Sequence, residues 1–150
     1  MAKTRARKTK ARKGKPFSVR FSAPTEMLVE EEARRLRRSK SAVVEAFTEE
    51  TARTRRFPGI AFRGDDARRR AWVVGSGLDV WEVVQMAEDF GSLERLLTET
   101  HLGERQVRLA LAYRAEYRDE IDDLVAENRR PTEELRALYP FIEHTAGPRG

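Results

Sequence analysis

Cysteine is absent from the sequence, and only two histidines occur among its 150 residues. Without cysteine the chain can form no disulfide and offers no thiolate nucleophile or metal ligand. Long hydrophobic runs are also missing. The chain has no stretch of about 18 apolar residues and no apolar signal-peptide core, so we expect neither a membrane helix nor secretion. These absences predict a cytoplasmic protein; separately, we expect no cofactor.

The composition is instead rich in charge, which is unevenly distributed. Charged residues make up 37% of the chain, and the formal net charge is +5. Residues 1–15 hold eight lysines and arginines and no acid, so the remainder sums to −3. Such a segment cannot bury enough apolar surface to fold alone. We predict a disordered basic arm over residues 1–15, with Lys13 and Lys15 as candidate ligands for the phosphates of a polyanion; an arm that only increases solubility is the alternative.

Residues 17–22 alternate between apolar and polar side chains, which is the pattern of a β-strand. One face would carry Phe17, Val19 and Phe21, and the other would carry Ser18, Arg20 and Ser22. A single strand is unstable because its backbone N–H and C=O groups need partners, and the next strand pattern lies far downstream. An edge strand with a solvated face is one interpretation. Pairing with the same strand of a second copy is the other.

Pairing between two copies would create a two-stranded antiparallel ribbon. The major groove of B-DNA is wide enough to admit such a ribbon with its polar side chains against the bases. Arginine can donate two parallel hydrogen bonds to guanine, and serine can donate or accept. The candidate base-reading residues are therefore Ser18, Arg20 and Ser22.

Two amphipathic helices are predicted after the strand. Pro24 suits the first turn of a helix, acidic residues follow it, and arginines lie near the expected end, which matches the helix dipole. Ser39 is placed to cap a second helix. The apolar stripe of that helix would consist of Val43, Val44 and Phe47. Free N–H groups at a helix N-terminus bind phosphate, so the candidate phosphate ligands here are Ser39, Lys40 and Ser41.

The strand and the two helices together resemble the ribbon-helix-helix family of bacterial repressors, to which Arc and CopG belong, over residues 16–52. The resemblance implies a homodimer or a higher assembly that binds double-stranded DNA through its ribbon. The family commonly has glycine between the two helices, where the chain makes a left-handed turn, but this chain has Arg37. We expect that arginine to cost roughly 1 kcal/mol of backbone strain.

The second half of the chain begins after the basic residues 53–56, where Phe57-Pro58-Gly59 breaks the helix. We predict a linker over 53–59 and two short strands over 60–63 and 71–74. The loop 75–77 precedes a helix that begins at Asp79, and Glu82 completes a capping box. Gly91 would end that helix and Ser92 would cap the next. After a joint at 100–103, three further helices are expected, the last of them beginning at Pro131.

The helix, short turn and helix around this joint are compatible with a helix-turn-helix. In that arrangement Arg105 and Arg108 are candidates for a second DNA contact. The same spacing occurs in ordinary helical bundles, so both interpretations stay open.

No arrangement of catalytic residues is recognisable in the sequence. The loop Gly75-Ser76-Gly77 lacks the lysine and the length of a P-loop, so it is interpreted as a chain reversal. The acidic residues between 116 and 127 have no calcium-binding loop around them and spread around a helix, which predicts a solvated or partner-facing surface. We expect that the protein is not an enzyme and binds no metal.

Three motifs stand out in the second half. They are Phe57-Pro58-Gly59-Ile60, Gly77-Leu78-Asp79-Val80-Trp81-Glu82 and Gln106-Val107-Arg108-Leu109-Ala110-Leu111-Ala112-Tyr113. With them, residues 57–130 resemble a family of small helical domains associated with VapB-type antitoxins. Relatives often have Pro-His-Leu-Thr at the helical joint, where this chain has Thr100-His101-Leu102-Gly103 and lacks the capping hydroxyl. The resemblance implies that the protein neutralises a PIN-type ribonuclease toxin and represses the shared operon.

The expected fold is mainly α. It comprises a basic arm (1–15), a ribbon-helix-helix segment (16–52) whose strand pairs in a dimer, a linker (53–59), and a small β-hairpin followed by a helix-turn-helix-like bundle (60–145). The leading interpretation is a homodimeric repressor, the antitoxin of a type II toxin–antitoxin pair, that binds an inverted-repeat operator. One alternative is a protein-interaction module whose C-terminal helices bind a partner. The other is a nucleoid-associated protein that binds DNA through its arm without sequence preference.

Overall fold

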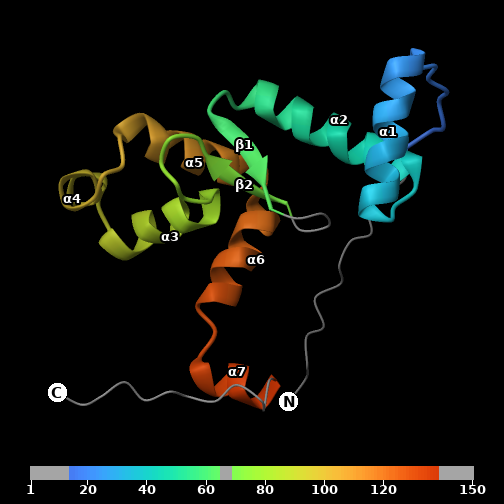
Figure 1. Ribbon diagram of the computed structural model, residues 1–150. Coiled ribbons are helices and arrows are strands. Elements are labelled where there is room, and N and C mark those ends of the chain that lie inside the picture. Colours follow the sequence, from blue (N-terminus) through green and yellow to red (C-terminus); the bar gives the residue numbers. More distant parts are fainter. Residues whose placement is uncertain (1–13, 65–68, 139–150) are drawn as a thin grey trace. The chain divides into compact units, whose positions relative to one another are not determined.

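The computed structural model describes residues 14–64 and 69–138 (Figure 1). Most of the described chain is helical, with a small two-stranded antiparallel sheet, so the expected mainly-α fold is confirmed. The chain divides between Val43 and Val44 into two compact units, called here the N-terminal unit and the C-terminal unit. Residues 1–13 of the predicted arm and residues 139–145 of the predicted bundle lie outside the described residues.

The N-terminal unit contains α1, Ala23–Leu36, and the first turn of α2, Lys40–Arg56. Pro24 lies in the first turn of α1, and basic residues lie in its last turn, as the sequence predicts. Its buried side chains include Val29, Ala33 and Val43. Residues 14–22, which precede α1, have no regular secondary structure in the single chain. The ribbon, which needs a second copy, stays a prediction.

Helix α2 is longer than the sequence indicates. It continues to Arg56, so residues 53–56 of the predicted linker are helical, and the boundary between the two units falls directly after its first turn. Arginine is a good helix former, and Pro58 disfavours helix only at the residue before it. A tertiary contact also stabilises this last part of the helix, because Arg53 forms an ion pair with Glu120 on a helix much later in the chain.

The hairpin consists of β1, Ile60–Arg63, and β2, Arg70–Val73. The strands pair antiparallel with Ile60 opposite Val73 and Arg63 opposite Arg70. β1 has the predicted bounds, whereas β2 begins and ends one residue before the predicted 71–74. In β2 the side chains of Ala71 and Val73 are buried and that of Arg70 is exposed, which is the alternation of a strand with one covered face.

Five helices follow the hairpin in the described chain. They are α3, Val80–Phe90; α4, Leu93–Glu99; α5, Glu104–Glu116; α6, Arg118–Asn128; and α7, Thr132–Leu138. Gly91 ends α3 in the left-handed conformation, with φ of 68°. The hydroxyl of Ser92 accepts a hydrogen bond from the backbone N–H of Arg95 and so caps α4. Both helix boundaries confirm the sequence prediction.

The core of the C-terminal unit gathers around α3, which packs against α4, α5, α6 and β2 (Figure 1). Helix α5 contributes Val107, Ala110 and Tyr113 to this core, and none of the three has exposed surface. Leu111, another apolar residue of this helix, is 39% exposed. The residues at i, i+3 and i+6 turn inward, and Leu111 lies beside that face. The other buried core residues are Ile60, Ala71, Val73, Val80, Val83, Val84, Leu96, Leu102, Ile121 and Val125.

Candidate nucleic-acid interface

The segment that precedes α1 presents an apolar row to solvent in the single chain. Phe17 is 86% exposed, Val19 55% and Phe21 41%. Fully burying a side chain of this size contributes about 1.5–3 kcal/mol. The segment is also paired with no other described strand. An exposed row of this kind beside free backbone groups is a template for pairing with another chain.

The three candidate base-reading residues are all exposed but differ in their surroundings. Among the described residues, Ser18 and Arg20 have no side-chain partner. Ser22 instead immediately precedes α1, where its carbonyl accepts the N–H of Glu26 and its hydroxyl lies 3.0 Å from that of Thr25. Ser22 therefore has a local role at the start of a helix, although its hydroxyl keeps further donor or acceptor capacity beside the contact with Thr25.

The joint between α1 and α2 turns through a left-handed residue, as the family resemblance implies. Arg37 has φ of 51° and ψ of 41°, and it is the non-glycine residue of the described chain with positive φ. The N–H of Arg38 donates to the carbonyl of Ala33, and that of Arg37 donates to Arg34. This is the Schellman pattern, which satisfies carbonyls at the end of a helix. The joint has the expected geometry although arginine replaces glycine.

The start of α2 holds the predicted phosphate ligands, and the single chain already engages two of them. The hydroxyl of Ser39 accepts the N–H of Ala42 at 3.2 Å, so Ser39 is the N-cap that the sequence predicts. The ammonium of Lys40 donates to the carboxylate of Glu30 on α1 and lies 3.6 Å from that of Glu26. Ser41 is exposed in the first turn of α2. Of the three side chains, only Ser41 has no intramolecular partner among the described residues.

The contact between Lys40 and Glu30 changes how both groups ionise. The hydrogen bond from Lys40 lowers the pKa of the Glu30 carboxyl, and the same bond raises the pKa of the Lys40 ammonium. Both side chains are about half exposed, so the pair is screened by solvent and salt. A DNA phosphate would have to compete with Glu30 for this ammonium group.

Positive charge is concentrated in the N-terminal unit. Residues 1–43 hold 14 basic and 4 acidic side chains, a formal charge of +10, whereas residues 44–150 hold 16 basic and 21 acidic side chains, a charge of −5. Lys15 is exposed, and Lys13 lies outside the described residues. A polyanion is therefore attracted to the N-terminal unit and not to the C-terminal unit.

The second candidate DNA contact lies on the C-terminal unit. Arg105 and Arg108 are exposed near the start of α5, after α4 and the joint 100–103. The guanidinium of Arg108 donates to Glu104 at 2.7 Å, whereas Arg105 has no ion-pair partner among the described residues. The order of helix, turn and helix is present, and contact with DNA by these arginines stays a prediction.

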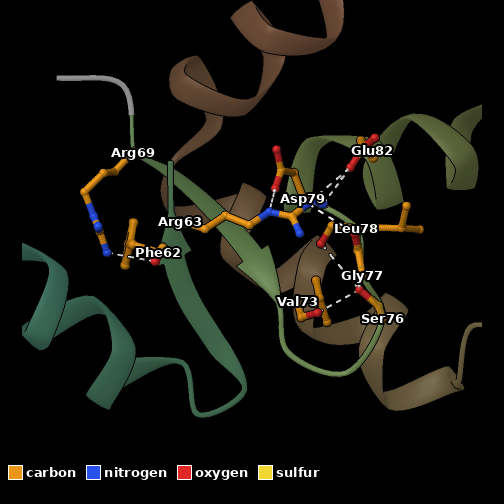
Figure 2. A network of polar contacts seen from close by, with 9 residues as sticks. All are labelled: Phe62, Arg63, Arg69, Val73, Ser76, Gly77, Leu78, Asp79 and Glu82. Carbon is orange, nitrogen blue, oxygen red and sulfur yellow. Dashed lines mark hydrogen bonds and ion pairs between the residues drawn. The ribbon is translucent and has the colours of Figure 1, made fainter. Parts of the chain in front are cut away.

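A polar network that the sequence did not indicate fixes the loop before α3 (Figure 2). Arg63 donates to the carboxylate of Asp79 at 2.7 Å and to the carbonyl of Gly77 at 3.1 Å. The hydroxyl of Ser76 donates to Val73 at 2.7 Å and accepts the N–H of Leu78 at 3.0 Å. Ser76 is thus buried within its own loop and is not aimed at a ligand. The loop is a chain reversal, as the sequence predicts.

The start of α3 uses only part of the predicted capping box. The carboxylate of Glu82 accepts the N–H of Asp79 at 2.7 Å. The carboxylate of Asp79 is instead engaged by Arg63 from β1 (Figure 2). The guanidinium of Arg63 also lies 5.1 Å from the centre of the Trp72 ring. Asp79 therefore ties the helix to the hairpin.

The acidic residues of α5 and α6 serve as ion-pair partners, which periodicity alone could not reveal. Glu116 pairs with Arg56 at 3.1 Å, Glu120 with Arg53 at 2.6 Å, and Asp122 with Arg114 at 2.6 Å. The expected solvated or partner-facing surface is thus partly used within the unit itself. In the described parts of the chain, no group of three or more His, Asp or Glu residues is arranged to hold a metal ion.

No helix among the described residues is long and apolar enough to cross a membrane. Comparisons of the chain with protein-family models, curated proteins and solved structures yield no match.

Proposed function

We propose that the protein is a transcriptional repressor that reads an inverted-repeat operator through a ribbon formed by residues 16–22 of two copies. The observation that carries the proposal is the exposed apolar row of Phe17, Val19 and Phe21, which directly precedes a helix, a left-handed turn and a second helix. Pairing two copies would cover this row. It would also align Ser18 and Arg20 of each copy along the opposite face.

The charge of the N-terminal unit supports the same proposal. Residues 1–43 carry a formal charge of +10, so this unit would be attracted to the DNA backbone. The arm would add affinity with little dependence on the DNA sequence. Sequence preference would then come from Arg20, whose guanidinium has no intramolecular partner among the described residues. Ser39 and Ser41 would approach a phosphate at the N-terminus of α2.

The second part of the proposal is that the repressor is an antitoxin. It rests on the resemblance of residues 57–130 to domains associated with VapB-type antitoxins, and the expected partner is a PIN-type ribonuclease. Co-expression of the full chain with the product of an adjacent gene tests this part by itself. We expect the chain to restore growth of cells that express this product and to co-purify with it. The absence of both results would reject the antitoxin role and would leave the DNA-binding proposal untested.

Footprinting of the full chain on its own upstream DNA tests the repressor proposal. We expect protection of an inverted repeat and, by light scattering, a dimer or a multiple of it. Arg20→Ala should weaken specific binding by about 1–3 kcal/mol and relax the preference at one base pair of each half-site. Arg130→Ala is the matched control, because it removes one exposed arginine from the C-terminal unit.

Two results would contradict this proposal. A strictly monomeric chain at micromolar concentration would leave the ribbon without its second strand. Protection without sequence preference, equally retained by Arg20→Ala, would instead favour a nucleoid-associated protein that uses its basic arm, which the charge of residues 1–43 also supports.

A further inference from the structure

The C-terminal unit has a shallow groove between the start of the hairpin and α5. It consists of two depressions, of about 720 and 350 Å³, that share Pro58, Arg105 and Leu109. The smaller one also reaches Val74, which follows β2, and the larger one reaches Arg108. Segments far apart in the sequence thus form one continuous surface feature.

The floor of the groove is apolar and open to solvent. Val74 is 49% exposed and Pro58 is exposed, while Leu109 is half-buried between the groove and the core. Gly59 lets the backbone approach Leu109, because a Cβ atom at this position would lie only 2.9 Å from its Cδ2 atom. An uncovered patch of this kind gains free energy when an apolar side chain displaces its water.

The rim of the groove on α5 carries Glu104, Arg105 and Arg108, a net charge of +1, although the C-terminal unit as a whole carries −5. Arg105 has no ion-pair partner among the described residues, and Arg108 is held by Glu104. A carboxylate bound beside Arg105 would gain a charge-assisted hydrogen bond without breaking one inside the unit. A DNA phosphate could use Arg105 but would leave the apolar floor uncovered, so the floor favours a ligand that also carries an apolar side chain.

We propose that this groove binds a peptide segment of a partner protein in which a bulky apolar side chain lies next to aspartate or glutamate. The apolar side chain would rest on Pro58, Val74 and Leu109, and the carboxylate would pair with Arg105. This inference goes beyond the proposed function, since it does not require the N-terminal unit to bind DNA.

The test uses the isotopically labelled full chain and three synthetic eight-residue peptides. The first has the sequence Gly-Ser-Asp-Leu-Phe-Glu-Ser-Gly, the second has alanine in place of Leu and Phe, and the third has lysine in place of Asp and Glu. We expect that only the first shifts the NMR signals of the amides of Gly59, Val74, Gln106 and Leu109. Arg105→Glu should weaken its binding at least about tenfold, as expected for reversing the charge of one partner in a close pair. Arg130→Glu, the same charge change after α6, should leave it unchanged.

Three results would overturn the proposal. One is equal binding of the first and second peptides, which would leave the apolar floor without a role. Another is a response of these amides to duplex DNA in place of the first peptide. The third is peptide binding that arises only when the chain is shortened to end at Leu138, which would show that its own last residues occupy the groove.

Discussion

Arg53, near the end of α2, donates a hydrogen bond of 2.8 Å to the hydroxyl of Tyr113 on α5. The same guanidinium pairs with Glu120 at 2.6 Å and lies 3.9 Å from the centre of the Tyr117 ring. Tyr113 has no exposed surface, and its burial raises the pKa of its hydroxyl. This cluster joins the second half of α2 to α5 and α6.

Removal of the Tyr113 hydroxyl should therefore destabilise the C-terminal unit. Tyr113→Phe leaves the guanidinium of Arg53 with one acceptor fewer, and we expect a loss of about 1–2 kcal/mol in the free energy of unfolding. Urea unfolding followed by the fluorescence of Trp72 and Trp81 measures it, because both lie in this unit. Tyr117→Phe is the control, since the Tyr117 hydroxyl has no hydrogen bond to the described residues and its ring contact survives. Equal losses in both variants would contradict the assigned role.

The left-handed turn at Arg37 makes a prediction for the N-terminal unit. Arg37→Gly should stabilise α1 and α2 by up to about 1 kcal/mol, because glycine adopts positive φ without the contact between Cβ and carbonyl. Arg37→Ala should give no such gain, since alanine has the same conflict and lacks only the charge. Hydrogen exchange of the amides of both helices measures the difference. A gain with alanine as large as that with glycine would show that charge, not backbone strain, decides the effect.

The pair formed by Lys40 and Glu30 predicts a pH dependence. The pKa of Glu30 is lower in the folded chain than in the unfolded chain, so the stabilisation by this pair is complete above the ordinary value of 4.5 and is lost as the pH falls through the folded value. The raised pKa of Lys40 acts at alkaline pH, where this stabilisation is lost as the pH rises through the pKa of Lys40 in the folded chain. An NMR titration of the Glu30 carboxyl carbon should show the lowered pKa, and Lys40→Met should restore the ordinary one.

Release of Lys40 from Glu30 should strengthen DNA binding if α2 approaches phosphate as proposed. We expect Glu30→Gln to raise the affinity and to steepen the dependence of log K on log salt by up to about 0.9, the value for one additional phosphate contact. Glu31→Gln removes the same charge from a neighbouring exposed position and is the control. Identical effects of the two variants would mean that only the general charge matters and that Lys40 contacts no phosphate.

Gly59 provides a test of packing beside the hairpin. It has φ of +104°, and a Cβ atom there would lie 2.9 Å from Leu109. Gly59→Ala should cost roughly 3 kcal/mol of stability, from backbone strain together with overpacking. Gly77 has φ of +76° but open space around it, so Gly77→Ala should cost only about 1–2 kcal/mol. Tryptophan fluorescence during urea unfolding again measures both, and equal costs would reject the close approach to Leu109.

Sequence patterns predicted the local elements of the C-terminal unit well. β1 has its expected bounds, and Gly91 and Ser92 mark the end of one helix and the start of the next as predicted. These features depend on neighbouring residues, through φ preferences and capping hydroxyls, and are therefore readable from a short stretch. The extent of α2 was predicted less well because Arg53 is bound by residues far along the chain.

Of the candidate interface, the sequence supplied the residue types and their order but not their partners. Ser22 and Lys40 are engaged with Thr25 and Glu30, and neither contact follows from the alternation or the helix dipole that singled them out. The groove beside Arg105 was not foreseen at all, because it brings together Pro58, Val74 and Leu109 from three segments that lie far apart in the sequence.

By itself the sequence determined where α3 ends and α4 begins, the alternation of residues 17–22 and the concentration of positive charge before residue 44, because each is a property of consecutive residues. Only the tertiary structure decided that α5 turns Tyr113 inward and leaves Leu111 in solvent, and that the acids of α6 pair with Arg53 and Arg114. Periodicity defines the faces of a helix. Which neighbours cover each face depends on how distant segments pack. That packing must fill the space between side chains and pair the charges at the same time.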